Sequence, residues 1–208
     1  MGSGHGSRAG RFSNGLKEFL WQLEDIGHGK LLDLGQVSQA TLTFFIERGF
    51  KVYTEDVLVS WREFLRSEEE RQRQLPAGAS SQDNLAGDRA ERFLAANLNH
   101  PSDSFDAVLL WDVLDYLDRE TVTRLMARLS TMVSDAGAVL AIFHTRTPEQ
   151  FYRFRVLDAL NLDPVEAPAI VPPQHIYQNR EIQELFRRFR TSKTFVGRDQ
   201  LRETVFVK

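Results

Sequence analysis

The stretch that decides the fold is FDAVLLWDVLDYL, at Phe105–Leu117. The run Phe105–Trp111 is apolar except for Asp106, as expected of a central parallel strand with both faces covered. A shorter apolar run, LLDLG at Leu31–Gly35, ends at a glycine and also has the character of a buried strand. Together the two runs predict an α/β protein with buried parallel strands at its centre.

The residues on either side of these runs alternate between the spacing of helices and that of strands. Helices are predicted over residues 14–23, 38–48, 57–74, 118–134, 150–160 and 180–189. Strands are predicted over residues 30–34, 50–54, 92–98, 105–111, 138–143, 194–196 and 204–207. This order predicts a doubly wound, mostly parallel sheet of seven strands with helices on both faces and a C-terminal antiparallel hairpin.

At 208 residues the chain is expected to form a single domain. Residues 1–13, rich in glycine and serine, are expected to be a flexible leader or tag remnant, so the domain spans residues 14–208. Residues 66–91 pass from a charged helix end into an Ala, Gly and Ser-rich stretch and are predicted to be a mobile surface excursion. The proline-rich residues 145–180 are predicted to form an insertion on the substrate side.

Composition excludes several classes of function. The 26 basic and 29 acidic residues sum to −3, so nucleic acid is not an expected partner. The absence of cysteine excludes disulfides and thiolate chemistry, and no His and carboxylate pair has metalloprotease spacing, so no metal is expected. No apolar run approaches the ~20 residues that span a bilayer. We therefore expect a cytoplasmic protein without membrane contact, whose oligomeric state stays open.

In open sheets of this kind the ligand lies outside the carboxyl ends of the strands, at the switch point. The LLDLG strand end, in register with the FDAVLLWDVLDYL block, resembles the class I S-adenosylmethionine-dependent methyltransferases over about Leu16–Lys208. The resemblance implies a methyltransferase that acts on a small-molecule substrate. It also implies S-adenosylmethionine as cofactor, direct methyl transfer, and S-adenosylhomocysteine as product.

The resemblance implies cofactor contacts after the first strand. Asp33 and Gly35 match the family's acidic residue and first glycine, whereas Val37 and Gln39 stand where two further glycines are usual. These side chains change the loop path or narrow the pocket, because glycine permits close approach and positive φ. Gln36, Val37 and Ser38 are the other cofactor-binding candidates of this turn, which leads into a helix N-terminus.

Further cofactor contacts are implied after the second and third predicted strands. Either Glu55 or Asp56 would accept hydrogen bonds from the ribose hydroxyls, and their spacing does not choose between them. Asn97 stands where the family has an adenine-contacting acidic residue, with Leu98 beside it as backbone donor.

The ends of the fourth and fifth predicted strands supply the remaining candidates. Trp111 and Asp112 would line the amino-acid end of the cofactor. His144, after the fifth strand, and Tyr177, in the proline-rich segment, are candidate substrate-binding residues. The sequence assigns no catalytic residue, because a general base needs hydrogen-bond reach that sequence does not display.

Alternative interpretations stay open. The absent glycines favour a methyltransferase fold retained without catalysis, as a binding or interaction module. A weaker alternative is a nicotinamide-binding Rossmann domain, although GxGxxG is absent after the first strand. Purely structural roles also compete, since Asp33 could cap the following helix and Trp111 could belong to the core.

Overall fold

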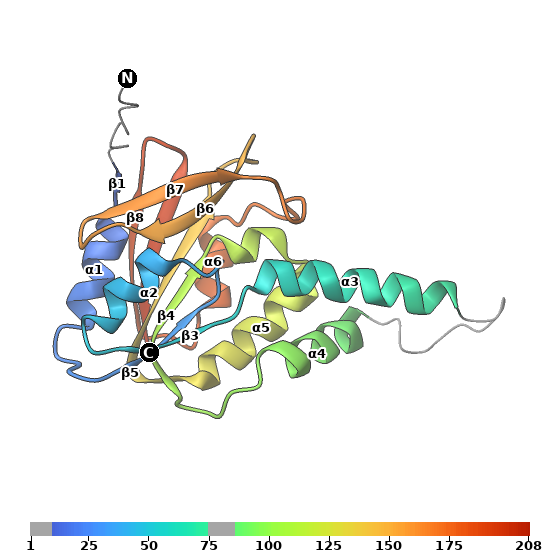
Figure 1. The fold of residues 1–208 in the computed structure, drawn as a ribbon, viewed down its shortest axis with the longest axis horizontal. Helices are drawn as coiled ribbons and strands as arrows, with labels where there is room; N and C mark the ends of the chain where they lie inside the picture. Colours follow the sequence, from blue (N-terminus) through green and yellow to red (C-terminus); the bar gives the residue numbers. More distant parts are fainter. Residues whose placement is uncertain (1–9, 75–85) are drawn as a thin grey trace, which may run out of the picture.

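The computed structural model describes residues 10–74 and 86–208, which form two sheets and the helices around them (Figure 1). The strands are β1 (Arg11–Phe12), β2 (Lys30–Asp33), β3 (Lys51–Thr54), β4 (Phe105–Trp111), β5 (Val133–His144), β6 (Phe151–Val156), β7 (Asn161–Ala167), β8 (Thr191–Val196) and β9 (Leu201–Val207). The helices are α1 (Asn14–Gln22), α2 (Gln39–Ile46), α3 (Val57–Arg73), α4 (Ala86–Asn97), the 3-10 helix η2 (Val113–Tyr116), α5 (Arg119–Met132) and α6 (Asn179–Leu185).

The main sheet is mixed and has six strands in the order β3-β2-β4-β5-β9-β8. Its first four strands are parallel, and β9 and β8 join them as an antiparallel hairpin. The α/β class and the terminal hairpin are therefore confirmed, but the prediction of seven strands is wrong. The segment predicted as a strand over residues 92–98 lies mostly in helix α4, where Ala90, Phe93 and Leu94 are buried at helical spacing.

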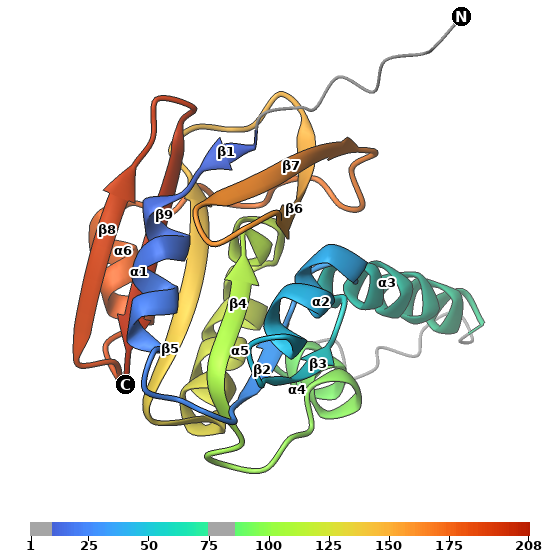
Figure 2. The ribbon, with the colours of Figure 1, turned by 60° about the vertical axis from the view of Figure 1, so that its left-hand side comes forward.

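Helices cover both faces of the main sheet, as the doubly wound prediction requires (Figure 2). On one face, α1 and α2 pack on strand residues such as Leu31 and Leu109. On the other face, α3, α4, α5 and α6 pack on strand residues such as Leu32 and Val108. Neighbouring residues of each strand thus enter opposite cores, because side chains alternate across a sheet. Because β3, β2, β4 and β5 are parallel, their carboxyl ends lie together at one edge of the sheet.

A second, antiparallel sheet of three strands has the order β1-β7-β6 and lies across that edge (Figure 2). The helix predicted over residues 150–160 is wrong, because this segment contains β6 and the turn toward β7. Phe154 and Val156 are buried while Arg155 between them is exposed, the two-residue period of a strand. The Val156 N–H donates to Thr41 Oγ1 of α2 at 3.0 Å, which attaches this hairpin to the main domain.

Two predicted segment boundaries also change. Arg11–Phe12 pairs with β7, and the Ser13 hydroxyl caps α1 by accepting from the Leu16 N–H at 2.9 Å, so residues 10–13 belong to the fold. The rest of the predicted leader lies outside the described residues. Of the predicted excursion over 66–91, the flanking parts are helical in α3 and α4, and residues 75–85 lie outside the described part. Within the described chain, no helix has the length and apolar character to cross a membrane.

Candidate functional site

The switch point of the main sheet lies between β2 and β4. From β2 the chain adds β3 on one side, and it later adds β4 and β5 on the other. The connections that leave the carboxyl ends of β2 and β4 therefore run to opposite sides, and this is where open α/β sheets place a ligand. Asp33 is the last residue of β2, and Trp111 is the last residue of β4.

Asp33 and Trp111 meet directly at the switch point. The buried Asp33 Oδ1 accepts from the indole Nε1–H of Trp111 at 2.7 Å and from the backbone N–H of Gly35 at 3.0 Å. The indole lies over Gly35, because a Cβ added to this glycine would be 2.7 Å from Nε1. The opposite side of the indole region is closed by Phe154 of β6, whose ring stacks on Trp111 with centroids 6.2 Å apart.

The ionisation of Asp33 is shifted by this environment. Burial raises its pKa to about 6, although the hydrogen bonds from Trp111 and Gly35 work in the opposite direction. Burial dominates because removal of a carboxylate from water penalises its charged form. The carboxylate is therefore ionised near neutral pH and takes up a proton under mildly acidic conditions.

The backbone of Trp111 is strained. Its φ of +52° lies in the left-handed region, which a bulky side chain rarely adopts. The pairing of β4 with β5 also shifts register between Leu109 and Trp111. Such conformations persist only where surrounding contacts hold them, and here the bond to Asp33 and the stacking on Phe154 do so.

The space left at the switch point is too small for an adenosyl cofactor. A cavity of only about 30 Å³ remains beside Gly35, Asp56 and Asp112, whereas small-molecule sites usually measure ~300 Å³ or more. The types of hydrogen-bonding group fit a cofactor with hydroxyl and amino groups. The space does not fit it, because Trp111 and Phe154 fill the position that the cofactor would need.

The other predicted cofactor residues near the switch point take different positions. Gln36 borders the small cavity, Val37 is exposed, and Ser38 is the N-cap of α2 without a side-chain capping bond. Asp56 also borders this cavity and caps α3 by accepting from Val59 N–H at 3.1 Å. Glu55 instead lies 3.5 Å from the His100 ring. Asp56 is thus the acidic residue that the fold brings beside Trp111.

Asn97 and Leu98 are not brought to the switch point. Asn97 ends α4, where its side-chain amide donates to the Phe93 carbonyl at 2.8 Å, and Leu98 is buried in the core. The chain then enters β4 at its amino end, at the opposite edge of the sheet from Asp33. The strand on which their predicted register depended is a helix, so their side chains do not follow that register.

A second cavity, of about 450 Å³, lies at the end of β5 between the second sheet and the β8–β9 turn. His144 borders it and is buried, and its Nε2 lies 3.0 Å from Asp112 Oδ2. The His144 backbone N–H donates to Asp115 Oδ2 at 2.7 Å, which fixes the residue at the strand end. With Nε2 occupied by Asp112, Nδ1 is the ring nitrogen left for a ligand. Tyr152 and Phe154 line both cavities.

The surroundings of the His144 imidazole shift its pKa. Burial lowers the pKa of His144, whereas the hydrogen bond and negative charge of Asp112 raise it. The effect of Asp112 outweighs that of burial, so the pKa lies above its usual value. Asp115 lies behind this pair, and burial raises the pKa of its carboxyl to about 8. Tyr116, whose ring contacts His144 edge-on at 6.2 Å, was not among the predicted site residues, and burial raises the pKa of its hydroxyl.

Tyr177 lies apart from His144. It is buried on the opposite face of the sheet, where its ring packs against Phe143 with centroids 6.3 Å apart. It borders a separate surface hollow of about 350 Å³ with Arg119 and Glu181. The two candidate substrate-binding residues are therefore not brought together.

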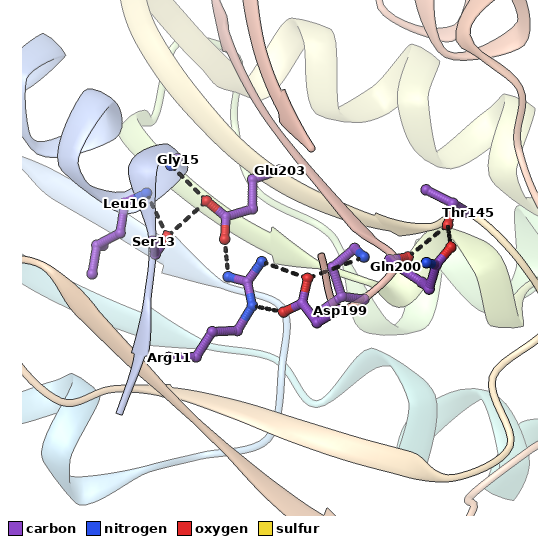
Figure 3. A network of polar contacts seen from close by, with 9 residues as sticks. Arg11, Ser13, Gly15, Leu16, Thr145, Asp199, Gln200 and Glu203 are labelled. Carbon is purple, nitrogen blue, oxygen red and sulfur yellow. Dashed lines mark hydrogen bonds and ion pairs between the residues drawn. The ribbon is translucent and has the colours of Figure 1, made fainter. Parts of the chain in front are cut away.

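An ionic network that includes the buried Glu203 borders the larger cavity through Arg11 and Asp199 (Figure 3). Arg11 binds the carboxylates of both Asp199 and Glu203. Glu203 is 2% exposed and also accepts from the Ser13 hydroxyl at 2.8 Å and the Gly15 N–H at 2.6 Å, at the start of α1. Sequence reasoning missed this network because Arg11 falls in the predicted leader. The only local signal is Ser13, a plausible N-cap.

Within residues 10–74 and 86–208, no group of three or more His, Cys, Asp or Glu side chains is arranged to hold a metal ion. The ionisable pairs at the strand ends are instead suited to hydrogen bonding and proton transfer.

Comparison with known proteins gives structural neighbours only. No family model matches the chain, and no curated protein matches it. Among solved structures, it is similar to the 1,6-didemethyltoxoflavin-N1-methyltransferase of Burkholderia thailandensis, which was crystallised with 1,6-didemethyltoxoflavin and S-adenosylhomocysteine. The TM-score is 0.47 and the identity 15%, over 94% of this chain and 78% of that one.

Two further neighbours are methyltransferases of similar length. An S-adenosylmethionine-dependent methyltransferase from Mesorhizobium loti has a TM-score of 0.47 and 15% identity, over 92% of this chain and 98% of that one. The N-methyltransferase NodS from Bradyrhizobium japonicum has a TM-score of 0.48 and 12% identity, over 93% of both chains. At these values the likeness assigns no residue role to this chain.

Proposed function

We propose that this chain is an S-adenosylmethionine-dependent methyltransferase that acts on a small molecule. The observation that carries the proposal is the buried carboxylate of Asp33 beside Gly35 at the switch point, bordered by Asp112 from the neighbouring strand. Asp56 is the candidate for the ribose hydroxyls. The turn of Gln36, Val37 and Ser38 completes the candidate cofactor surface, and no position is proposed there for Asn97 or Leu98.

The cavity beside His144 is the proposed acceptor site. Its volume of about 450 Å³ is in the range of small-molecule sites, and Tyr152 and Phe154 suit a planar acceptor. His144 Nδ1 would accept the proton of an acceptor O–H or N–H, and Asp112 would stabilise the resulting imidazolium. The cofactor, when bound, supplies the methyl group; these residues orient the acceptor and hold its proton.

A second candidate function is favoured by the filled switch point. Because Trp111 occupies the space over Gly35, the chain could retain the fold without methyl transfer and bind a ligand only in the larger cavity. This candidate predicts that no adenosyl compound binds, whatever stands at position 111.

Calorimetric titration with S-adenosylhomocysteine separates the two candidates. The methyltransferase proposal predicts saturable heat with the full chain, its loss in Asp33→Asn, and no change in Asp25→Ala, which removes an exposed carboxylate. NADH serves as the nucleotide control and tests the nicotinamide alternative. Absence of heat with S-adenosylhomocysteine at millimolar concentration, in the wild type and in folded Trp111→Ala, would overturn the proposal in favour of the second candidate.

A further inference from the structure

Trp111 is held at the switch point by three independent features. Its indole N–H donates to a buried carboxylate, its ring covers a glycine, and its backbone is in the left-handed region. A buried indole N–H normally finds a partner, so the distinctive features are the contact over Gly35 and the positive φ, which a tryptophan that served only as core would not need.

The indole of Trp111 uses the same carboxylate and the same space that the proposed cofactor would use. Asp33 Oδ1 is already used by the indole and by Gly35 N–H. The open space over Gly35, where a bound molecule could approach the backbone closely, is taken by the same ring. Only about 30 Å³ remains beside it.

We propose that Trp111 is an internal occupant of the cofactor cleft, and that binding of an adenosyl cofactor requires its indole to leave Asp33 and Gly35. This inference rests on the proposed function. The hydrogen bond to Asp33 is exchanged for one from the cofactor, so no buried carboxylate is left unpaired in either state.

The second sheet is part of this arrangement. Phe154 stacks on the indole from β6, and Phe154 also lines the larger cavity beside His144. Departure of the indole removes the packing partner of Phe154 and so alters the wall of the acceptor cavity. Cofactor binding and acceptor binding are therefore coupled through one pair of rings.

The occupant lowers the apparent affinity for the cofactor. A ligand that binds only the open state has its dissociation constant increased by the inverse of the open fraction. Truncation of the indole removes this competition, so Trp111→Ala is expected to bind S-adenosylhomocysteine about tenfold more tightly than the wild type. Trp111→Phe, which loses the N–H but can still stack on Phe154, should show a smaller gain.

The experiment combines titration with a fluorescence reporter. In Trp21→Phe/Trp61→Phe, Trp111 is the only tryptophan of the chain, and its emission should shift to longer wavelength on saturation with S-adenosylhomocysteine, as the ring leaves a buried site. The affinities of Trp111→Ala and Trp111→Phe are measured by calorimetry, with folding checked by circular dichroism. Trp21→Ala is the matched control, because Trp21 is exposed and its loss should leave the affinity unchanged.

The outcomes separate this inference from the proposed function. Tighter binding by Trp111→Ala together with the emission shift supports the occupant. Binding to the wild type without an emission shift overturns the occupant and leaves the methyltransferase proposal standing. No binding to the wild type or to the folded variants overturns both. If Trp111→Ala does not fold, the reporter chain, which retains Trp111, gives the deciding measurement.

Discussion

His144 Nε2 lies 3.0 Å from Asp112 Oδ2, and both side chains are more than nine-tenths buried. Asp112 directly follows β4 and His144 is the last residue of β5, and these two parallel strands are neighbours in the sheet. Asp112 borders the small cavity at the switch point, whereas His144 borders the larger one. The pair therefore forms part of the wall between the two cavities. A change in the charge of either residue alters the electrostatic potential in both cavities.

Asp112→Asn is expected to lower the pKa of His144. In the wild type burial lowers this pKa, but the hydrogen bond and charge of Asp112 raise it above the usual 6.5. Asparagine keeps the size and removes the charge, so burial then prevails. NMR titration of the imidazole resonances measures the shift, and His175, which pairs with Glu181, is the internal control.

The same substitution should change how stability depends on pH. Because the folded-state pKa of His144 is raised, the pair contributes stability that is fully present below pH 6.5 and lost as the pH rises through the folded value. Asp112→Asn should therefore cost most at about pH 6 and least in alkaline solution. An unchanged His144 resonance in Asp112→Asn would show that the hydrogen bond does not set its ionisation.

Asp115→Asn should flatten the pH dependence of stability between pH 4 and 8. Burial raises the pKa of Asp115 from 3.8 to about 8, so the folded state retains a proton that the unfolded state releases. Stability from this group is present below pH 3.8 and declines toward pH 8, with a slope of at most about 1.4 kcal/mol per pH unit. Urea denaturation of both proteins at several pH values checks the difference. Parallel profiles would contradict a proton held at Asp115.

Gly35→Ala tests the contact between the carboxyl ends of β2 and β4. The added methyl group would lie 2.7 Å from the Trp111 Nε1 atom, so the indole must move or the loop must shift. Overpacking of this kind costs about 1–3 kcal/mol. Chemical denaturation measures the loss, and Gly27→Ala is the control because nothing lies within 4 Å of its added methyl group. Equal effects of the two substitutions would mean that the indole does not cover Gly35.

The centres of the parallel strands are predictable from sequence, and their neighbours less so. Phe105–Trp111 is recognisable because it is apolar on both faces, which only a covered strand requires. The strand predicted over residues 92–98 is wrong because Arg, Leu and Ala favour a helix there, and the segment lies mostly in α4. Residues 150–160 mix Arg and aromatic side chains in a pattern that fits the period of a helix as well as that of a strand. The structure shows the strand, because Val156 pairs with Leu162 of β7.

The candidate site divides in the same way. Asp33, Trp111 and Asp112 are found from sequence because each lies at or next to the end of a recognisable strand. That Trp111 fills the cleft depends on its φ and on a stacking partner in β6, and neither is encoded within its own stretch of sequence. The pairing of Asp112 with His144 joins positions 32 residues apart, so it depends on the neighbouring placement of β4 and β5 and is not visible in the local sequence.

Arg11→Ala should destabilise the fold far more than a surface ion-pair substitution. Arg11 is the cation bound to Glu203, which is 2% exposed, and its removal leaves a buried carboxylate with only the Ser13 and Gly15 donors. Breaking such a pair from one side costs about 3–5 kcal/mol. Arg155→Ala, which removes the more exposed partner of Asp163, is the matched control and should cost about 0.5 kcal/mol.

The Arg11 substitution also has a test that separates charge from packing. Arg11→Ala/Glu203→Gln removes both charges, so it should recover part of the stability lost in Arg11→Ala, because no uncompensated buried carboxylate remains. Urea denaturation of the two single variants and the double variant gives the coupling energy. A double variant as unstable as the sum of the single ones would mean that Arg11 and Glu203 act independently.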